Sequence, residues 1–165
     1  MRSSCSEYSE YFQWNYCDEW SGIKKKAWHV FDEEKAYLHH QQHQPYTAVL
    51  TDEGQPKYII NITSKWVSVS FYDHLVRKYL NYDFEVVEEG KVFLRTAIHW
   101  KYEHDTDKKL STMIFGFKET GYIAMEKRDF STGEVLERES QGSVDNNWTV
   151  FPEFGDYLYL CKEER

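Results

Sequence analysis

The residues whose chemistry could support metal binding gather in one short segment. His39, His40 and His43 lie close together, and the step from His39 to His43 would put two imidazoles on the same side of a helix. Their neighbours are glutamines and Pro45, and no carboxylate or cysteine within several positions supplies a third ligand. We therefore interpret the cluster as a solvated connector, and we predict neither a metal ion nor any other cofactor.

Carboxylates that could act as an acid/base pair occur at Glu126, Glu137 and Glu139. General acid/base catalysis needs one desolvated carboxyl with a raised pKa, whereas the charged segment 134–139 is expected to be exposed. The chain also has no glycine-rich phosphate loop, nucleophile elbow, paired-histidine zinc helix or dinucleotide fingerprint. We predict that the protein is not an enzyme. A small barrel enzyme that uses His99 with Glu126 is the third alternative.

The long strand expected over 91–103 has two faces of different character, because successive side chains alternate. One face is apolar and should lie in the core; it carries Val92, Leu94, Ile98, Trp100 and Tyr102. The other face mixes aromatic, small and charged side chains, namely Phe93, Arg95, Ala97, His99 and Lys101. Glu126 and Arg128 give the strand expected at 122–128 a similar mixed face. Such a face is either an ordinary outer surface with cross-strand ion pairs or the lining of a cup that orients a ligand.

The elements that must position these residues are short alternating or aromatic-rich runs separated by polar turns. The runs predict hairpins at 26–31 with 36–39 and at 46–50 with 57–62, a strand at 67–72, a meander through 82–88, 91–103, 109–118, 122–128 and 134–140, and a last strand near 156–162. Short helices are expected near 6–18 and 73–80. This pattern predicts a mainly β, single-domain antiparallel meander of about ten strands over residues 1–165. Twist should curl it into a barrel or a deeply curved, calycin-like sheet.

A C-terminal segment at 145–157 departs from this periodicity. It places Trp148, Phe151 and Phe154 around a rigid Pro152 and a permissive Gly155. The three aromatic side chains either plug one end of the barrel or form a recognition surface.

Composition and charge exclude several classes of protein. With 6 Trp, 13 Tyr and 10 Phe and no long apolar run, the chain is neither disordered nor a membrane-spanning protein. Asp and Glu outnumber Lys and Arg by 28 to 20, so nucleic acid and anionic membranes are disfavoured and a basic partner is favoured. The N-terminal residues lack the apolar stretch of a secretory signal, which predicts a cytoplasmic protein. Cys5, Cys17 and Cys161 are expected to be free thiols.

Several short segments of the sequence resemble segments of known proteins. In the order 69–73, 79–84, 126–129, 131–134 and 145–157, residues 58–165 resemble a group of small uncharacterised bacterial proteins. Such short acidic proteins look like immunity or other interaction partners encoded near secreted toxins. No site residue is implied by this resemblance.

The leading hypothesis is a non-enzymatic, cytoplasmic protein of immunity type that neutralises a basic toxin domain through an acidic and aromatic surface. Its alternative is a calycin-like carrier or sensor of a small amphipathic ligand. The candidate residues for a partner or ligand are Arg95, His99, Glu126, Arg128, Trp148, Phe151 and Phe154.

Overall fold

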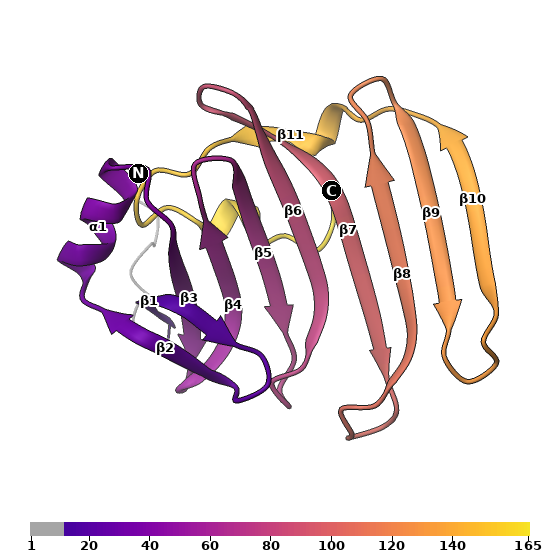
Figure 1. Cartoon of the computed structure of the whole chain (residues 1–165), viewed down its shortest axis with the longest axis horizontal. Coiled ribbons are helices and arrows are strands. Elements are labelled where there is room, and N and C mark those ends of the chain that lie inside the picture. The colour runs from indigo at the N-terminus through magenta and orange to yellow at the C-terminus, as the bar shows by residue number, and fades with distance from the viewer. Residues whose placement is uncertain (1–11) are drawn as a thin grey trace, which may run out of the picture.

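The computed structural model describes residues 12–165, which form one antiparallel sheet (Figure 1). Its strands are β1 (Phe12–Ser21), β2 (Lys26–Phe31), β3 (Tyr46–Asp52), β4 (Gln55–Ile62), β5 (Trp66–Tyr72), β6 (Lys78–Glu88), β7 (Lys91–Tyr102), β8 (Lys109–Phe117), β9 (Tyr122–Asp129), β10 (Val135–Gln141) and β11 (Trp148–Val150). The strand order is β10-β9-β8-β7-β6-β5-β4-β3-β1-β2, and β11 pairs with β7. The prediction of a mainly β antiparallel meander is confirmed. The sheet is open, with β10 and β2 at its two ends, so the closed barrel is not formed.

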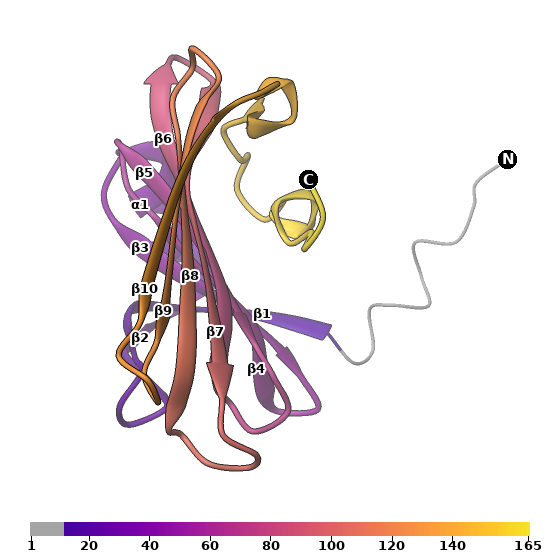
Figure 2. The same ribbon diagram turned by 90° about the vertical axis from the view of Figure 1, so that its right-hand side faces the viewer.

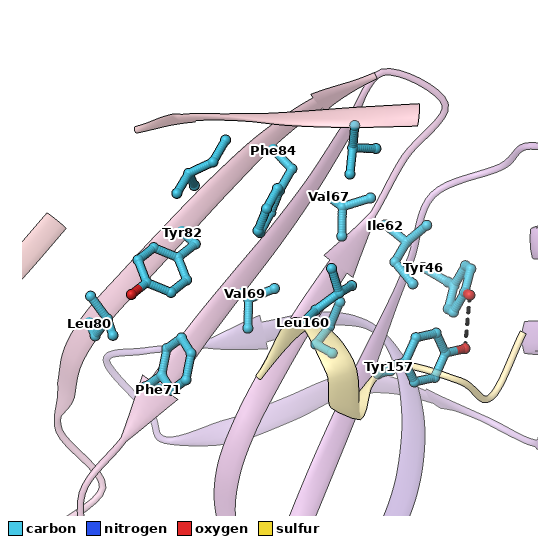
Figure 3. Close-up of a cluster of buried hydrophobic side chains, with 14 of the residues drawn as sticks. Tyr46, Ile62, Val67, Val69, Phe71, Leu80, Tyr82, Phe84, Tyr157 and Leu160 are labelled. Carbon is cyan, nitrogen blue, oxygen red and sulfur yellow. Dashed lines mark hydrogen bonds between the residues drawn. The ribbon is translucent and has the colours of Figure 1, made fainter. Parts of the chain in front are cut away.

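One face of the sheet, called the inner face below, packs against the C-terminal segment 142–165 (Figure 2). Tyr157 and Leu160 of that segment are fully buried among side chains of β3 to β7 (Figure 3). Those sheet residues include Tyr46, Ile60, Ile62, Val67, Val69, Phe71, Leu80, Tyr82, Phe84, Val92 and Leu94. Burying one such side chain contributes roughly 1.5–3 kcal/mol, so the C-terminal segment is an integral part of the core.

The opposite, outer face is partly covered by the β1–β2 hairpin. β1 pairs with β3 through Cys17 and then crosses the outer face, where the Trp20 ring contacts Tyr72. At the hairpin tip, Lys25 Nζ lies 3.3 Å from the Leu75 carbonyl oxygen and 3.4 Å from Asp107 Oδ1. The hairpin is thus tied to the turns that follow β5 and β7.

The helix α1 (Glu33–Gln41) occupies residues for which the sequence predicted the second strand of a hairpin, so that prediction is wrong. Asp32 caps the helix, because its Oδ1 accepts a hydrogen bond from the Lys35 amide at 2.7 Å. Glu33 and Glu34 then lie in the first turn, where acidic side chains interact favourably with the helix dipole. Among residues 12–165, no helix is long and apolar enough to cross a membrane.

Three further expectations are wrong. Residues 12–18 belong to β1 instead of a helix, while 6–11 lie outside the described residues. Residues 73–77 form a turn, in which Asp73 Oδ1 accepts hydrogen bonds from the Leu75 and Arg77 amides, and β6 starts at Lys78. The end of the chain has a short 3-10 helix over Leu158–Leu160 in place of a strand.

A β-bulge at Arg95 changes the faces predicted for the long strand. Leu94 pairs with Phe84 and Thr96 with Asp83, so Arg95 is an extra residue in β7. The alternation shifts by one beyond this point, which places Ala97 in the same inner core as Leu94. The expectation that Leu94 shares a face with Trp100 is therefore wrong, because Trp100 lies on the outer face.

Candidate binding surface

The strands β8, β9 and β10 form the least covered part of the sheet, called the β8–β10 region below. The C-terminal segment leaves β10 and turns back towards β7, so it does not cover β9 or β10 (Figures 1 and 2). All seven residues of β10 are exposed. Charged side chains on such an edge strand oppose pairing with another sheet. Phe115 and Phe117 of β8 pack against the inner core, whereas the outer face of this region is open to a partner.

On the outer face of the β8–β10 region two glutamates stand directly opposite each other. The antiparallel register pairs Glu126 of β9 with Glu137 of β10. Arg128 Nε donates a hydrogen bond to Glu126, and this bond with the charge of Glu126 raises the pKa of Arg128. Further along β10, a hydrogen bond with Glu139 raises the pKa of the Tyr122 phenol. This face therefore carries three carboxylates and one guanidinium within two strands.

Two of the neighbouring basic residues, Lys127 and Arg138, do not neutralise this cluster, because strand alternation directs them to the other face. Lys127 follows Glu126 in β9, and Arg138 follows Glu137 in β10. Like charges in directly opposed strand positions destabilise a sheet by a few tenths of a kcal/mol. A cation brought by a partner would relieve this repulsion.

The Arg95 side chain binds two carboxylates that stabilise the bulge. Its Nε donates to Glu85 at 2.5 Å and its NH2 group donates to Glu119 at 2.6 Å, while its guanidinium carbon lies 4.9 Å from the centre of the Phe93 ring. Two carboxylates thus surround one guanidinium. Arg95 links β6 to the turn between β8 and β9 and has little positive charge to offer a ligand.

His99 lies on the inner face, away from Glu126. The register pairs His99 with Met113 and Met113 with Lys127, whereas Glu126 pairs with Ile114. Burial lowers the pKa of His99, and the charge of Glu163 opposes this effect. The four residues expected on one mixed face are therefore divided: Glu126 and Arg128 lie together, whereas Arg95 and His99 are elsewhere. A cup lined by all four is not formed.

The C-terminal aromatic residues also separate into two groups. Trp148 belongs to β11, and its ring lies 4.8 Å from that of Phe93, with about a third of the residue exposed. Phe154 stacks on Tyr16 at 5.2 Å and contacts Tyr37 of α1 at 5.4 Å. Phe151 lies 6.0 Å from the His40 ring. Phe151 and Phe154 occupy the position of a plug between α1 and the sheet, so Trp148 is the more accessible of the three.

Among residues 12–165, the cysteines and the histidines of α1 form no metal site. Cys17 is buried, and burial followed by the charge of Asp18 raises the pKa of its thiol to about 11. His39 and His40 bind the Pro45 carbonyl oxygen and the Tyr46 hydroxyl. In the part of the chain that the structure describes, no three His, Cys, Asp or Glu side chains are grouped to hold a metal ion.

The sequence predicted that the strand at 134–140 pairs with the strand at 122–128, and this pairing is confirmed, but Glu137 and Glu139 were considered only as catalytic groups and the opposition of Glu137 to Glu126 was not predicted. The signal was present in the loop between the strands, because its length and its Gly133 with φ of 76° set the hairpin register. Comparison of the chain with protein-family models, with curated proteins and with solved structures found no match. The proposed function accordingly rests on the geometry of the molecule.

Proposed function

We propose that this chain is a non-enzymatic binding protein of immunity type, which takes a basic protein partner on the outer face of the β8–β10 region. The observation that carries the proposal is the direct opposition of Glu126 and Glu137 on the outer face, where Arg128 bonds to Glu126 and Lys118 lies over the Tyr122 ring at 5.2 Å. A lysine or arginine of a partner placed between these carboxylates replaces a repulsion by an attraction. The cytoplasm, where an immunity protein meets its toxin, is the compartment that this proposal implies.

The charge of the whole chain supports the same type of partner. A formal charge of −8 attracts a cationic domain over a distance of about one Debye length, ~8 Å at physiological salt, and raises the association rate. Side chains of Tyr122 and Val135 lie on the same face as the glutamates and supply apolar contact area. Val135 is about half exposed, so a partner that covers it buries apolar surface.

The direct test uses the protein encoded by the adjacent gene and measures its binding by isothermal titration calorimetry. We expect binding that weakens when the salt concentration rises from about 50 to about 300 mM, because a charged interface is screened. Glu137→Gln should weaken the binding by about tenfold, as expected for an interfacial charge pair worth about 1.4 kcal/mol.

The matched control is Glu53→Gln, which makes the same charge change in the turn between β3 and β4, at the other side of the sheet. Equal effects of Glu53→Gln and Glu137→Gln would assign the effect to net charge and reject the β8–β10 region as the interface. An adjacent gene that encodes no basic protein, or binding that is independent of salt, would reject the immunity type.

A further inference from the structure

A second place on the outer face has the opposite charge. A pocket of about 420 Å³ lies between the tip of the β1–β2 hairpin and the turns that follow β5 and β7. Four cationic side chains line it, Lys25, Arg77, Lys78 and Lys109, against the single carboxylate of Asp107. In a chain with 28 acidic and 20 basic residues, this local excess of positive charge runs against the composition.

Two of these cations hold the pocket together. Arg77 Nε lies 2.9 Å from Asp73 Oδ2, and its NH1 group donates to the carbonyl oxygens of His104 and Thr106 at 2.7 Å. Lys25 joins the hairpin tip to Asp107 and to the Leu75 carbonyl oxygen. These contacts join three loops, so the charged groups of Lys25 and Arg77 already bind partners within the protein.

The other two cations, Lys78 and Lys109, lie over one aromatic ring. Lys78 Nζ is 5.1 Å and Lys109 Nζ is 5.6 Å from the centre of the Trp100 ring. Within residues 12–165, neither ammonium group has an ion pair or a hydrogen bond. The carboxylate that influences the pKa of Lys78 is that of Asp83, whose Oδ1 accepts hydrogen bonds from the side chains of Ser68 and Asn81.

Holding these two ammonium groups together without an anion is unfavourable. Burial lowers the pKa of Lys78, and the like charge of Lys109 lowers it further, although Asp83 acts in the opposite direction. An anion in the pocket that both groups line would offset this repulsion and replace the water lost by burial. The site is therefore organised for a negative group that the chain itself does not supply.

The remaining lining suits an organic anion. The Tyr72 hydroxyl makes no hydrogen bond within the described residues, and burial raises the pKa of this phenol to about 12, so it stays a donor. Ile23 is almost fully exposed at the rim and presents an apolar side chain to an occupant. The volume lies in the range of roughly 300–1,000 Å³ of small-molecule sites and exceeds the need of an inorganic ion.

We propose that this pocket binds a small organic dianion, whose phosphate or carboxylate groups contact Lys78, Lys109 and the Tyr72 hydroxyl while its apolar part lies against Ile23 and Val76. Lysine ammonium groups bind such anions as point charges. The site lies apart from Glu126 and Glu137 and goes beyond the proposed function, so either proposal can fail without the other.

The test is calorimetric titration of the full chain with phenyl phosphate, isophthalate, inorganic phosphate and neutral phenol. We expect the two organic dianions to bind with Kd below about 1 mM, and phenol and inorganic phosphate to bind at least about tenfold less tightly. Preference for phenyl phosphate over isophthalate, or the reverse, assigns the anionic group. No dianion binding below this limit, or inorganic phosphate binding as tightly as the organic anions, overturns the proposal.

Variants locate the site. Lys109 is exposed and its replacement leaves the core intact, so Lys109→Gln should weaken dianion binding by about tenfold while the fold is kept. Lys101→Gln is the matched control, because Lys101 follows Trp100 in β7 and lies on the other face of the strand. Equal losses in the two variants would show binding to net charge alone and would refute the site. As a readout that does not depend on Lys109, the ¹³C NMR titration of Lys78 should give a higher pKa with saturating dianion, and an unchanged pKa would also refute it.

Discussion

The phenol oxygens of Tyr46 and Tyr157 lie 2.9 Å apart, although 111 positions separate these residues in the chain. Tyr46 belongs to β3 and Tyr157 to the C-terminal segment, and both are fully buried. His40 Nδ1 of α1 lies 2.8 Å from the same Tyr46 hydroxyl. Burial raises the pKa of each phenol above its ordinary range, so both remain protonated and able to donate. One hydroxyl chain thus connects the helix, the sheet and the segment that closes the core.

Removal of these hydroxyls should show how much the hydrogen bonds among His40, Tyr46 and Tyr157 contribute to the free energy of unfolding. Tyr157→Phe keeps the ring and removes the hydrogen bonds with Tyr46 and Tyr16, so we expect the free energy of unfolding to fall by about 2 kcal/mol. Tyr46→Phe should also cost about 2 kcal/mol, because His40 and Tyr157 each lose one hydrogen bond. Urea denaturation measures both values. Tyr37→Phe is the control, since the hydroxyl of half-exposed Tyr37 makes no hydrogen bond within the described residues. A Tyr46→Phe cost no larger than that of Tyr37→Phe would contradict a stabilising role.

The stability of the protein should fall as the pH decreases below neutrality. Burial lowers the pKa of His40, and His43 lowers it further, while burial also lowers the pKa of His99. The folded state therefore binds fewer protons than the unfolded chain. The stability due to neutral histidine is present above the unfolded pKa of about 6.5 and is lost as the pH falls through the folded pKa.

We expect the urea midpoint to decrease between about pH 7.5 and about pH 5.5, a window in which most carboxylates stay ionised. His40→Gln should reduce this dependence, and His40→Gln combined with His99→Gln should reduce it further. Equal pH dependence in the wild-type chain and the double variant would assign the effect to other groups.

The sequence predicted the central meander well because its strands are long, alternating and bounded by turn residues. The expected strand at 91–103 matches β7 within one residue, and the turn with Gly54 has positive φ at both Glu53 and Gly54. Such signals are local, and the antiparallel pairing follows from the short loops. The mainly β character of the fold could therefore be predicted from the sequence.

The remaining errors have physical causes in tertiary structure. The Arg95 bulge is held by Glu85 and Glu119, which come from other strands and turns, so no local pattern reveals that His99 changes face. The short helix α1 was read as a strand because its side chains lack a clear apolar stripe, and only Ala36 is buried. Its acidic start at Asp32, Glu33 and Glu34 was the available signal. Grouping Arg95 and His99 with Glu126 failed for the same reason as the face assignment.

Two glycines with the same backbone conformation should respond differently to alanine. Gly121 has φ of 90° and Gly133 has φ of 76°, so both substitutions place a side chain in the left-handed region. A Cβ at Gly121 would lie 2.5 Å from the Gly142 carbonyl oxygen, whereas Gly133 has open space around it. We expect Gly133→Ala to cost about 1 kcal/mol and Gly121→Ala about 2–4 kcal/mol, because the second adds a backbone clash. Chemical denaturation measures the difference, and equal costs would contradict the close approach of Gly142, the residue that follows β10.

The opposed pair Glu126 and Glu137 predicts that one substitution has opposite effects on folding and on binding. Glu137→Gln removes the like charge across the strands, and we expect it to raise the free energy of unfolding by a few tenths of a kcal/mol. Arg128 limits this gain, because it also loses the attraction of Glu137. If the same glutamate contacts a basic partner, the variant is more stable when free and binds less tightly. Residues kept for function often cost stability in this way.

Thermal unfolding at about 20 mM salt, where the repulsion between Glu126 and Glu137 is least screened, measures the effect on stability. A loss of stability in Glu137→Gln would mean that the glutamate is held by the fold itself, and the argument for a partner at this face would lose its main support.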